Sequence, residues 1–356
     1  MKFADVLEIK NGRNQRQVEN PDGRYPIYGS GGVMGRADDY ICEAETVVIG
    51  RKGSINNPIF VNEPFWNVDT AFGLIAKRDV LLPKYLYYFC VNFDFEKLNT
   101  TVTIPSLTKA NLLQIEIALP TLEEQKKVVD VLDKVTNLVE LRQQQLAKLD
   151  ELVKARFVEM FGGINESVWY PYQTIESFTS VMSGGTPDRN IPEYWQGNIR
   201  WIKTTELKNC IITDTEEKIS QLGVENSSAK IIPANSILVA MYGQGKTRGM
   251  TGYITVECAT NQACACILPS EKINQKYLWK YIVFSYDKLR SMAKGGNQPN
   301  LNAGIIRKFP VLMPPMNLQN RFAVFAEQVE KTKLFIQNSL KQMETLKKAL
   351  IQQYFG

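Results

Sequence analysis

The sequence contains no histidine among its 356 residues. Histidine is the usual general base near neutral pH and the commonest metal ligand in proteins. Its absence excludes Ser-His and Cys-His nucleophile pairs, together with every metal site that needs an imidazole. Chemistry based on carboxylates and a metal ion stays open, because 37 aspartates and glutamates are present.

Cysteines in zinc-binding pairs are also missing. None of the six cysteines stands in a CxxC pair. Cys264 and Cys266 alternate within NQACACIL, which predicts a buried strand. A zinc site built from Cys258, Cys264 and Cys266 would have the wrong spacing for tetrahedral ligands. We therefore expect no metal site.

Long hydrophobic runs are absent as well. No apolar run reaches the ~18 residues that a membrane-spanning helix needs. The N-terminal residues MKFADVLEIK lack the apolar segment of a signal peptide. We therefore expect a cytoplasmic protein with reduced thiols and no membrane partner. The net charge of +5 is a mild basic bias, compatible with binding to nucleic acid.

The most informative feature that is present is an internal repeat. Residues 119–162 align without a gap with residues 313–356, at an offset of 194. Identical pairs include Pro120/Pro314, Gln125/Gln319, Leu152/Leu346 and Phe161-Gly162/Phe355-Gly356. Such a duplication predicts a pseudo-twofold protein, and hence a partner or target with twofold-like organisation.

Both repeated segments have the pattern of a long amphipathic helix. In the first, Thr121 and Glu124 form a capping box, and Gly162-Gly163 marks the end. In the second, Asn317 is the expected N-cap. Apolar residues recur in both segments with a period near 3.5. In the first segment they are Val128, Val131/Leu132, Val135, Leu138/Val139, Leu146, Leu149, Leu152/Val153 and Phe157. In the second they are Phe322, Val329, Ile336, Met343 and Leu350, with Phe325, Leu340 and Leu346 beside them.

Helices of roughly 38 residues would each be ~57 Å long, and their apolar stripe must be covered. We expect an intramolecular antiparallel coiled coil that holds two globular segments apart. Two separate helices used for oligomerisation are the alternative. The segments between the helices are rich in short apolar runs broken by Gly, Pro and Asn, which predicts strands and hairpins, with one helix in each, over 83–97 and 275–293.

The expected fold class is therefore α+β, with two strand-rich domains, two long helices and an internal pseudo-twofold repeat. The expected boundaries are 1–118 for the first domain, 119–162 for the first long helix, 163–312 for the second domain and 313–356 for the second long helix.

Several sequence blocks, in this order along the chain, resemble the specificity subunit of type I restriction–modification systems. They are the proline-then-EQ helix start (120–125), SGGTPDRNIPEYWQGNIRWIKTTEL (183–207), YGQGKTRGMTG (242–252) and GGNQPNLN (295–302). The first half carries GSGGVMG (29–35) and GRKGS (50–54) in place of the glycine-rich strings of the second.

The resemblance implies two target-recognition domains that each bind one half of a split, asymmetric site on double-stranded DNA. It implies that the helices set the spacer between the half-sites. It also implies that they dock two methyltransferase subunits and, through these, restriction subunits. A subunit of this family has no catalytic activity of its own, so we expect no catalytic residue and no cofactor.

Basic and amide side chains in turns are the candidates for DNA contact. Arginine can pair with guanine, and asparagine or glutamine with adenine, through two hydrogen bonds. Lys246 and Arg248 are the strongest candidates, because the glycines beside them allow close backbone approach. The alternative is that these are ordinary solvated turn residues. The candidates are Arg51, Lys52, Asn56 and Asn57 in the first half, and Lys203, Tyr242, Gln244, Lys246, Thr247, Arg248, Asn261 and Gln262 in the second.

Other functions have weaker support from the sequence. A magnesium-dependent nuclease would use Asp188, in a turn, with Glu206 and Lys208 on one face of a strand. AMYGQGKT (240–247) is close to a phosphate-binding loop, but a strand follows where a helix is required. NPIF (57–60) is similar to the NPPF loop of amino-methyltransferases but lacks the second proline. The last alternative is a coiled-coil scaffold that binds no nucleic acid.

Overall fold

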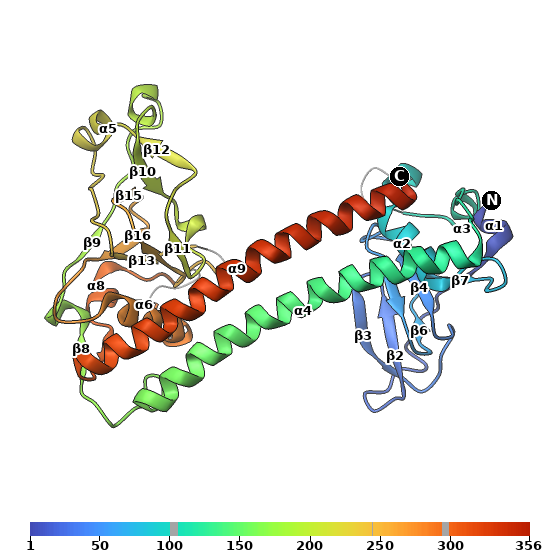
Figure 1. The fold of residues 1–356 in the computed structure, drawn as a ribbon, viewed down its shortest axis with the longest axis horizontal. Coiled ribbons are helices and arrows are strands. Elements are labelled where there is room, and N and C mark those ends of the chain that lie inside the picture. The colour runs from blue at the N-terminus through green and yellow to red at the C-terminus, as the bar shows by residue number, and fades with distance from the viewer. Residues whose placement is uncertain (100–105, 244, 294–298) are drawn as a thin grey trace. The chain divides into compact units, whose positions relative to one another are not determined.

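The computed structural model describes residues 1–99, 106–243, 245–293 and 299–356. The chain divides into two compact units, a first unit of residues 1–145 with 336–356 and a second unit of residues 146–335. Two long helices, α4 (Leu122–Phe161) and α9 (Met316–Phe355), each contribute one end to each unit. Figure 1 shows both helices with the strand-rich parts of the chain.

The first unit contains two small sheets beside its helix segments. A four-stranded antiparallel sheet has the order β1-β7-β4-β5, and a three-stranded sheet has the order β3-β2-β6, in which β6 is parallel to β2. The central strand β4 is buried at every position, as expected for a continuous apolar run. The strands are β1 (Leu7–Asn11), β2 (Tyr25–Gly29), β3 (Gly32–Ala37), β4 (Thr46–Gly50), β5 (Ile59–Val61), β6 (Trp66–Asn67) and β7 (Ala71–Ala76). The helices before α4 are α1 (Phe3–Val6), α2 (Pro83–Asn92), the 3-10 helix η1 (Phe95–Leu98) and α3 (Lys109–Leu112).

The second unit contains a five-stranded sheet of order β11-β14-β13-β16-β9, a three-stranded sheet β12-β10-β15 and a two-stranded sheet β17-β8. The strands are β8 (Tyr172–Thr174), β9 (Val181–Ser183), β10 (Ile199–Ile202), β11 (Cys210–Ile212), β12 (Glu217–Ile219), β13 (Ile237–Ala240), β14 (Thr251–Ile254), β15 (Ala259–Thr260), β16 (Cys264–Ile267) and β17 (Pro310–Leu312). The helices are η2 (Ile175–Ser177), η3 (Pro192–Trp195), η4 (Thr204–Glu206), α5 (Gln221–Glu225), α6 (Gln275–Phe284), α7 (Tyr286–Ser291) and α8 (Ala303–Arg307).

The two units repeat one strand arrangement, which confirms the duplication predicted from the sequence. The order β1-β7-β4-β5 recurs as β9-β16-β13-β14, with β11 added at the edge. The order β3-β2-β6 recurs as β12-β10-β15, with one antiparallel and one parallel pair in each. The bridge between Lys2 and Glu116 corresponds to the β8–β17 pair. The α+β class is therefore confirmed.

The first long helix begins and ends as the sequence predicts. The Thr121 hydroxyl accepts from the Glu124 amide at 3.3 Å, and the Glu124 carboxylate accepts from the Thr121 amide at 2.9 Å. The Thr121 hydroxyl also donates to the Glu124 carboxylate at 2.8 Å, and this bond, together with the bond from the Thr121 amide, lowers the pKa of Glu124. Gly162 has a φ of 80°, the left-handed conformation that favours glycine after a helix. The predicted cap of the second helix is wrong. Because α9 already begins at Met316, Asn317 lies inside its first turn.

The predicted helices over 83–97 and 275–293 are each interrupted. Asp94 accepts a hydrogen bond from the Glu96 amide and so starts a separate 3-10 helix, η1. Ser285 ends α6, because its backbone leaves the helical conformation, at φ −88° and ψ 15°, and its hydroxyl donates to Asn165. Each predicted helix is therefore two: α2 and η1 in the first unit, and α6 and α7 in the second.

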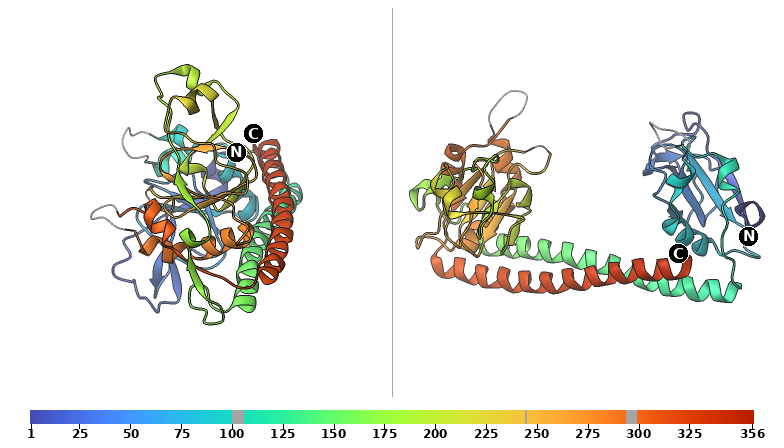
Figure 2. Two further views of the ribbon diagram at one scale, coloured as in Figure 1. Left: turned by 90° about the vertical axis from the view of Figure 1, so that its left-hand side faces the viewer. Right: turned by 90° about the horizontal axis from the view of Figure 1, so that it is seen from above.

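The long helices pack against each other within each unit, running in opposite directions (Figure 2). In the second unit, the Lys333 ammonium of α9 lies 2.5 Å from the Asp150 carboxylate of α4. Leu132, Val135, Val139, Val153 and Phe157 of the predicted stripe are buried. Other predicted members of the stripe are exposed, with Val131 at 36%, Leu138 at 44%, Leu152 at 48% and Leu346 at 49%. The covered stripe is therefore narrower than the apolar pattern suggests.

Each long helix ends against the strand-rich part of the other repeat. Phe161, at the end of α4, is fully buried in the second unit, with its ring 5.3 Å from that of Tyr277. Phe355, at the end of α9, packs in the first unit, with its ring 4.9 Å from that of Tyr85. Tyr85 and Tyr277 occupy the same place on α2 and α6. The two halves therefore exchange helix ends.

The cysteine-containing strand and the hydropathy of the helices agree with the sequence pattern. Cys264 and Cys266 lie in β16, which is buried at every position, as predicted. Burial raises the pKa of the Cys264 thiol to about 12. Within the described residues, no helix has the length and apolar character required to cross a membrane.

Candidate nucleic-acid interface

The loop between β13 and β14 carries most of the second-half candidates. Its described residues, 241–243 and 245–250, are called the β13–β14 loop below. Tyr242 is 42% exposed, and Lys246 is exposed at the loop tip. Gly243, with a φ of 135°, could not carry a side chain without displacing Thr247, which a Cβ would approach to 2.8 Å. The predicted contact Gln244 lies outside the described residues.

Three further candidates lie at the same edge of the sheets. Lys203 directly follows β10, and Asn261 and Gln262 follow β15, its parallel neighbour. The Asn261 amide donates to the Ile202 carbonyl at 3.3 Å. The Met241 amide donates to the carbonyl of Ala263 at 2.8 Å, which places this turn beside the β13–β14 loop. The fold thus gathers candidates that are about 60 residues apart in the sequence.

Several of these side chains already have partners within the protein. The Lys203 ammonium lies 2.8 Å from Glu216 and 3.1 Å from Glu217, and its hydrogen bond to Glu216 is the main cause of its raised pKa. A guanidinium nitrogen of Arg248 donates to the carbonyl of Pro299. Gln262 accepts from the Thr186 hydroxyl at 2.6 Å. Lys246 and Tyr242 are therefore more accessible to DNA than Lys203 or Arg248.

The four first-half candidates lie in one loop, residues 51–58, between β4 and β5. This β4–β5 loop corresponds to the β13–β14 loop in the repeated strand order. Arg51 and Lys52 are exposed, and the Arg51 amide donates to the Thr70 carbonyl at 2.8 Å. The Asn56 side chain accepts from the Phe95 amide at 2.7 Å and donates to Asp94 at 3.0 Å. Asn57 is exposed beside it.

A buried glutamine joins each long helix to the module that precedes it in the chain. The Gln125 side chain accepts from the Leu82 amide and donates to the carbonyls of Val80 and Pro120, each at 2.9 Å. The Gln319 side chain accepts from the Asn274 amide at 2.9 Å and donates to the Pro314 carbonyl at 2.8 Å. Leu82 and Asn274 are the N-caps of α2 and α6. We call this pair of contacts the glutamine junctions.

Ion pairs lie beside both glutamine junctions. Lys84 of α2 lies 2.5 Å from Asp133 of α4, and Lys276 of α6 lies 2.6 Å from Glu327 of α9. The hydrogen bond from Lys276 lowers the pKa of Glu327. The proline-then-EQ start noted in the sequence therefore has a structural basis, since its glutamine fixes a neighbouring helix.

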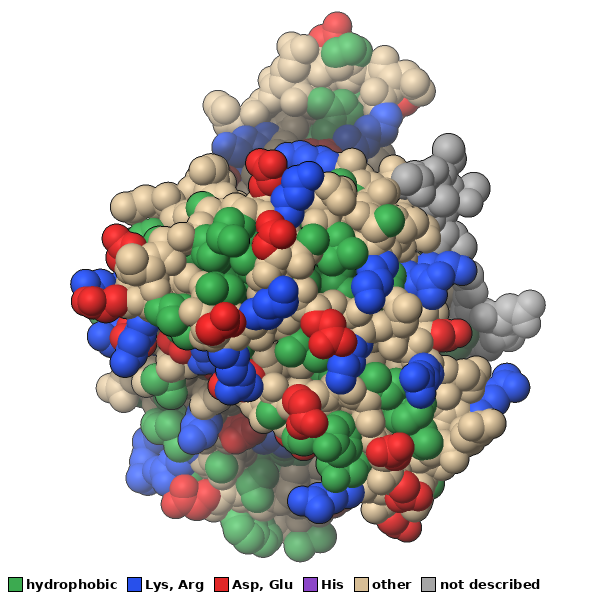
Figure 3. All heavy atoms as spheres, turned by 90° about the vertical axis from the view of Figure 1, so that its right-hand side faces the viewer, with side chains coloured by type: hydrophobic (Ala, Val, Ile, Leu, Met, Phe, Trp, Pro, Cys, Tyr) green, Lys and Arg blue, Asp and Glu red, His purple; other side chains and the backbone are tan. Residues whose placement is uncertain are grey.

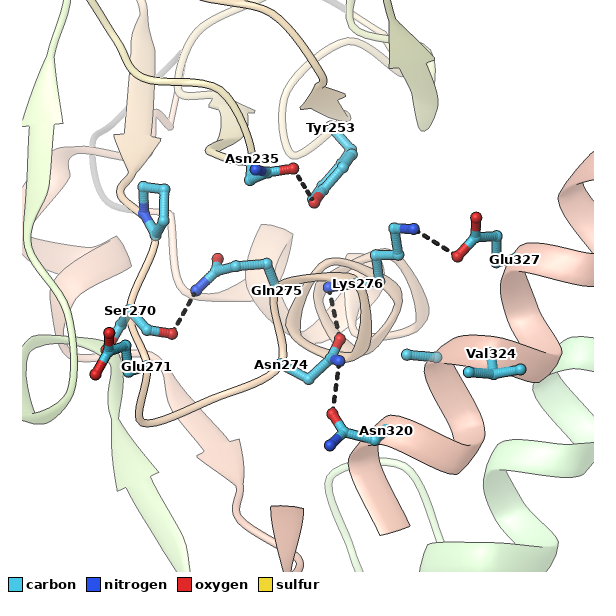
Figure 4. A pocket seen from close by; sticks show the side chains of 12 residues that line it. Asn235, Tyr253, Ser270, Glu271, Asn274, Gln275, Lys276, Asn320, Val324 and Glu327 are labelled. Atoms are coloured by element: carbon cyan, nitrogen blue, oxygen red, sulfur yellow. Dashed lines mark hydrogen bonds and ion pairs between the residues drawn. The ribbon is translucent and has the colours of Figure 1, made fainter. Parts of the chain in front are cut away.

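A pocket of about 570 Å³ opens at the junction in the second unit, where α6 and α9 begin (Figure 4). Asn274, Lys276, Asn320 and Glu327 line it and are joined in pairs by the contacts drawn there. Val324, 57% exposed, forms part of its apolar wall. None of the predicted DNA contacts that the structure describes lines this pocket.

The carboxylates of the nuclease alternative accept hydrogen bonds from backbone amides of the protein. Glu206 lies in the 3-10 turn η4, so the predicted strand face shared with Lys208 is wrong. Its carboxylate accepts from the Lys203 amide at 2.9 Å and the Glu216 amide at 3.2 Å. Asp188 accepts from the Asn190 amide at 2.9 Å. Among the residues that the structure describes, no group of three or more His, Cys, Asp or Glu side chains could hold a metal ion.

The phosphate-loop alternative fails on connectivity. The segment 240–247 connects two antiparallel strands, β13 and β14, whereas a phosphate-binding loop opens into a helix. On the face in view in Figure 3, charge marks no single binding surface. Figure 3 shows acidic side chains interspersed with lysines and arginines over the face in view.

The structure also reveals contacts between the predicted residues and side chains outside the predicted set. Thr186 contacts Gln262, Asp94 contacts Asn56, and Tyr286 and Arg290 contact the β13–β14 loop. Thr186 lies within the GGTP string, which was the one available signal. Tyr286 and Arg290 lie on a short helix without a motif, about 40 residues beyond the loop.

Comparison with known proteins places this geometry in a family. The family of the type I restriction modification DNA specificity domain matches residues 1–151 and 170–345. The specificity subunit of the Escherichia coli type I restriction enzyme EcoR124I/EcoR124II is 25% identical over 266 residues, 70% of this chain and 63% of that protein. The specificity subunit of the Methanocaldococcus jannaschii type I restriction enzyme MjaIX is 27% identical over 188 residues, 50% of this chain and 41% of that protein. The matches thus span less than two thirds of these relatives.

Solved structures share the fold over the whole chain. The S subunit of a type I restriction–modification system from M. genitalium aligns with a TM-score of 0.65 at 13% identity, covering 100% of this chain and 95% of that one. A chain from a study of complex assembly and conformational transition of the type I R-M system aligns with a TM-score of 0.56 at 16% identity, covering 100% and 96%. With its repeated strand order, its paired long helices and the family match over both halves, this chain belongs to the type I restriction modification DNA specificity family.

Proposed function

We propose that this chain is the DNA sequence-specificity subunit of a type I restriction–modification complex. The observation that carries the proposal is one strand arrangement present twice, with different residues in the equivalent loops. A repeated frame suits two copies of one partner, whereas unlike loops suit a target whose two halves differ.

Each strand-rich domain, 1–118 and 163–312, binds one half of an asymmetric site on double-stranded DNA in this proposal. The segments 119–162 and 313–356 set the spacer between the halves. Lys52, Tyr242 and Lys246 are the best-placed contacts, because their side chains are exposed in the β4–β5 and β13–β14 loops. Arg51, Asn56, Asn57, Lys203, Gln244, Thr247, Arg248, Asn261 and Gln262 stay as further predicted contacts.

The proposed partners are two methyltransferase subunits that dock on the long helices and restriction subunits that bind through them. One structural neighbour comes from a study of how such a complex assembles, which supports this proposal. The chain itself is proposed to bind and not to catalyse, so that methylation and cleavage belong to its partners.

Mapping of methylated sites tests the proposal. Cells that express the chain with its cognate methyltransferase should methylate one bipartite motif, and cells without the chain should lose it. The purified chain should also bind that motif in preference to a scrambled one. Loss of affinity with rising salt should follow the number of phosphates contacted.

Metal-dependent cleavage tests the nuclease alternative. DNA cleavage by the purified chain in magnesium, abolished by Glu206→Ala, would overturn the non-catalytic assignment. Methylation that continues unchanged after deletion of the chain would overturn the specificity function itself.

A further inference from the structure

We propose that Tyr286 and Arg290 of α7 are positioning residues that fix the backbone of the β13–β14 loop and thereby determine which bases the second domain selects. This inference rests on the proposed DNA-recognition function. It assigns a role to two side chains that need not contact DNA themselves.

Two side chains of α7 hold two carbonyls of the loop. The Tyr286 hydroxyl donates to the Lys246 carbonyl at 2.6 Å. The Arg290 guanidinium donates to the Arg248 carbonyl at 2.7 Å and to the Tyr286 hydroxyl at 3.0 Å. The held carbonyls flank Thr247, so the contacts fix the direction of the backbone on both sides of one loop residue.

The loop approaches α7 closely because Gly249 has no side chain. A Cβ at Gly249 would lie 3.1 Å from the Arg290 side chain and 3.4 Å from the Tyr286 ring, and its φ of 87° disfavours other residues. Meanwhile the side chains of Tyr242 and Lys246 stay exposed. The contacts with α7 therefore constrain the backbone and leave the proposed DNA-contacting side chains accessible.

The supporting helix is itself fixed in the core. Leu289 of α7 is 1% exposed, and Ser285, between α6 and α7, is 1% exposed and bonded to Asn165. Tyr286 and Arg290 thus connect a loop tip to a packed element. Recognition of a base edge requires correctly placed donors and acceptors, and a loop held in its binding geometry loses less entropy on binding.

The first unit uses the same place on the fold with different residues. There the short helix after α2 is η1, which corresponds to α7 after α6. Asn56 of the β4–β5 loop accepts from the Phe95 amide at 2.7 Å and donates to Asp94 at 3.0 Å. In both units the loop that follows the equivalent strands β4 and β13 therefore contacts the short helix that comes later in the same unit. Different residues therefore hold the equivalent loop in each unit. This favours a role for these residues in setting the shape of the loop.

Selection of duplexes from a randomised pool by the full-length chain tests this inference. Tyr286→Phe removes one hydroxyl and no charge, and Arg290→Met removes the guanidinium. Each should reduce the preference for the best base at one half-site by roughly three- to tenfold, as loss of one or two hydrogen bonds predicts. The other half-site should keep its selectivity, which shows that the first domain still binds, and an unchanged circular dichroism spectrum and thermal midpoint show that the second unit is still folded. Arg290→Lys should restore part of the preference.

Lys288→Met is the matched control, because it removes one positive charge from the same helix. If Arg290→Met acted through charge, both variants would weaken binding to all sequences and leave the base preferences alone. That outcome would overturn the positioning role and leave the specificity function standing. The same holds if the base preferences of Tyr286→Phe and Arg290→Met lie within twofold of those of the parent chain. If the unsubstituted chain selected no sequence, the specificity function would fail as well.

Discussion

Replacing Gln125 by alanine should destabilise the first unit more than any change to an exposed glutamine of the same helix. The Gln125 side chain is fully buried and makes three hydrogen bonds of 2.9 Å to backbone groups. Alanine would leave those groups without this partner. A buried polar group without a hydrogen-bond partner costs about 1–3 kcal/mol. Because local relaxation will give some of the three backbone groups a new partner, we expect the free energy of unfolding to fall by about 3 kcal/mol.

The equivalent change in the second unit provides an internal comparison. Gln319 is 2% exposed and makes two such bonds. Gln319→Ala should therefore cost less, about 2 kcal/mol. Gln143→Ala is the control, because Gln143 is exposed on the same helix as Gln125, and its cost should stay within about 0.5 kcal/mol.

Urea denaturation and amide hydrogen exchange together measure these effects. Denaturation gives the free energy of unfolding, and exchange of the Leu82 amide reports directly on the bond to Gln125. Exchange at Leu82 should accelerate in Gln125→Ala and stay unchanged in Gln319→Ala and Gln143→Ala. Equal stability of Gln125→Ala and Gln143→Ala, or an unchanged rate at Leu82, would refute the structural role of the junction.

Three further expectations concern the helix ends and the loop. Phe161→Ala should destabilise the second unit by about 3–5 kcal/mol, because it removes a fully buried aromatic ring. Val168→Ala is the control, since the Val168 side chain is 92% exposed, and an equal shift in the melting temperature of both variants would contradict this. Deletion of residues 350–356 should speed amide hydrogen exchange in α2 of the first unit, where Phe355 packs. Unchanged protection of the α2 amides would contradict the packing of the α9 end against the first unit. Lys246→Ala should weaken binding to all sequences and lower the salt slope by about one, whereas an unchanged slope would place Lys246 away from phosphate.

The frame of the fold is predictable from the sequence because its signals are periodic and repeated. Thr121, Glu124 and Gly162 delimit the first helix through local hydrogen bonds and backbone conformation, which depend on neighbouring residues alone. The width of the buried stripe is less predictable. Leu138 and Leu152 fit the period yet are 44% and 48% exposed, because burial depends on what faces each turn.

The site is predictable only in part, for a different reason. Glycine-rich turns identify the loops, and the fold brings Lys203, Asn261 and Lys246 to one edge because their strands are neighbours. The sequence around a side chain does not show whether that side chain will be paired with another residue of the protein. Lys203 contacts Glu216, 13 residues away, and Tyr286 contacts Lys246, 40 residues away, so both contacts depend on how separate elements pack.

The repeat separates two kinds of contact, which differ in how alike their residues are in the two halves. Contacts that join a module to the long helices keep their chemistry in both halves: a buried glutamine, a lysine–carboxylate pair and an aromatic helix end. Contacts that support the loops keep their place and change their residues. The pairing of Asn56 with Asp94 in one half corresponds to Tyr286 and Arg290 in the other. A change of target therefore has to involve the supporting helix as well as the loop, because a loop placed on the wrong support would lose the backbone geometry that presents its side chains.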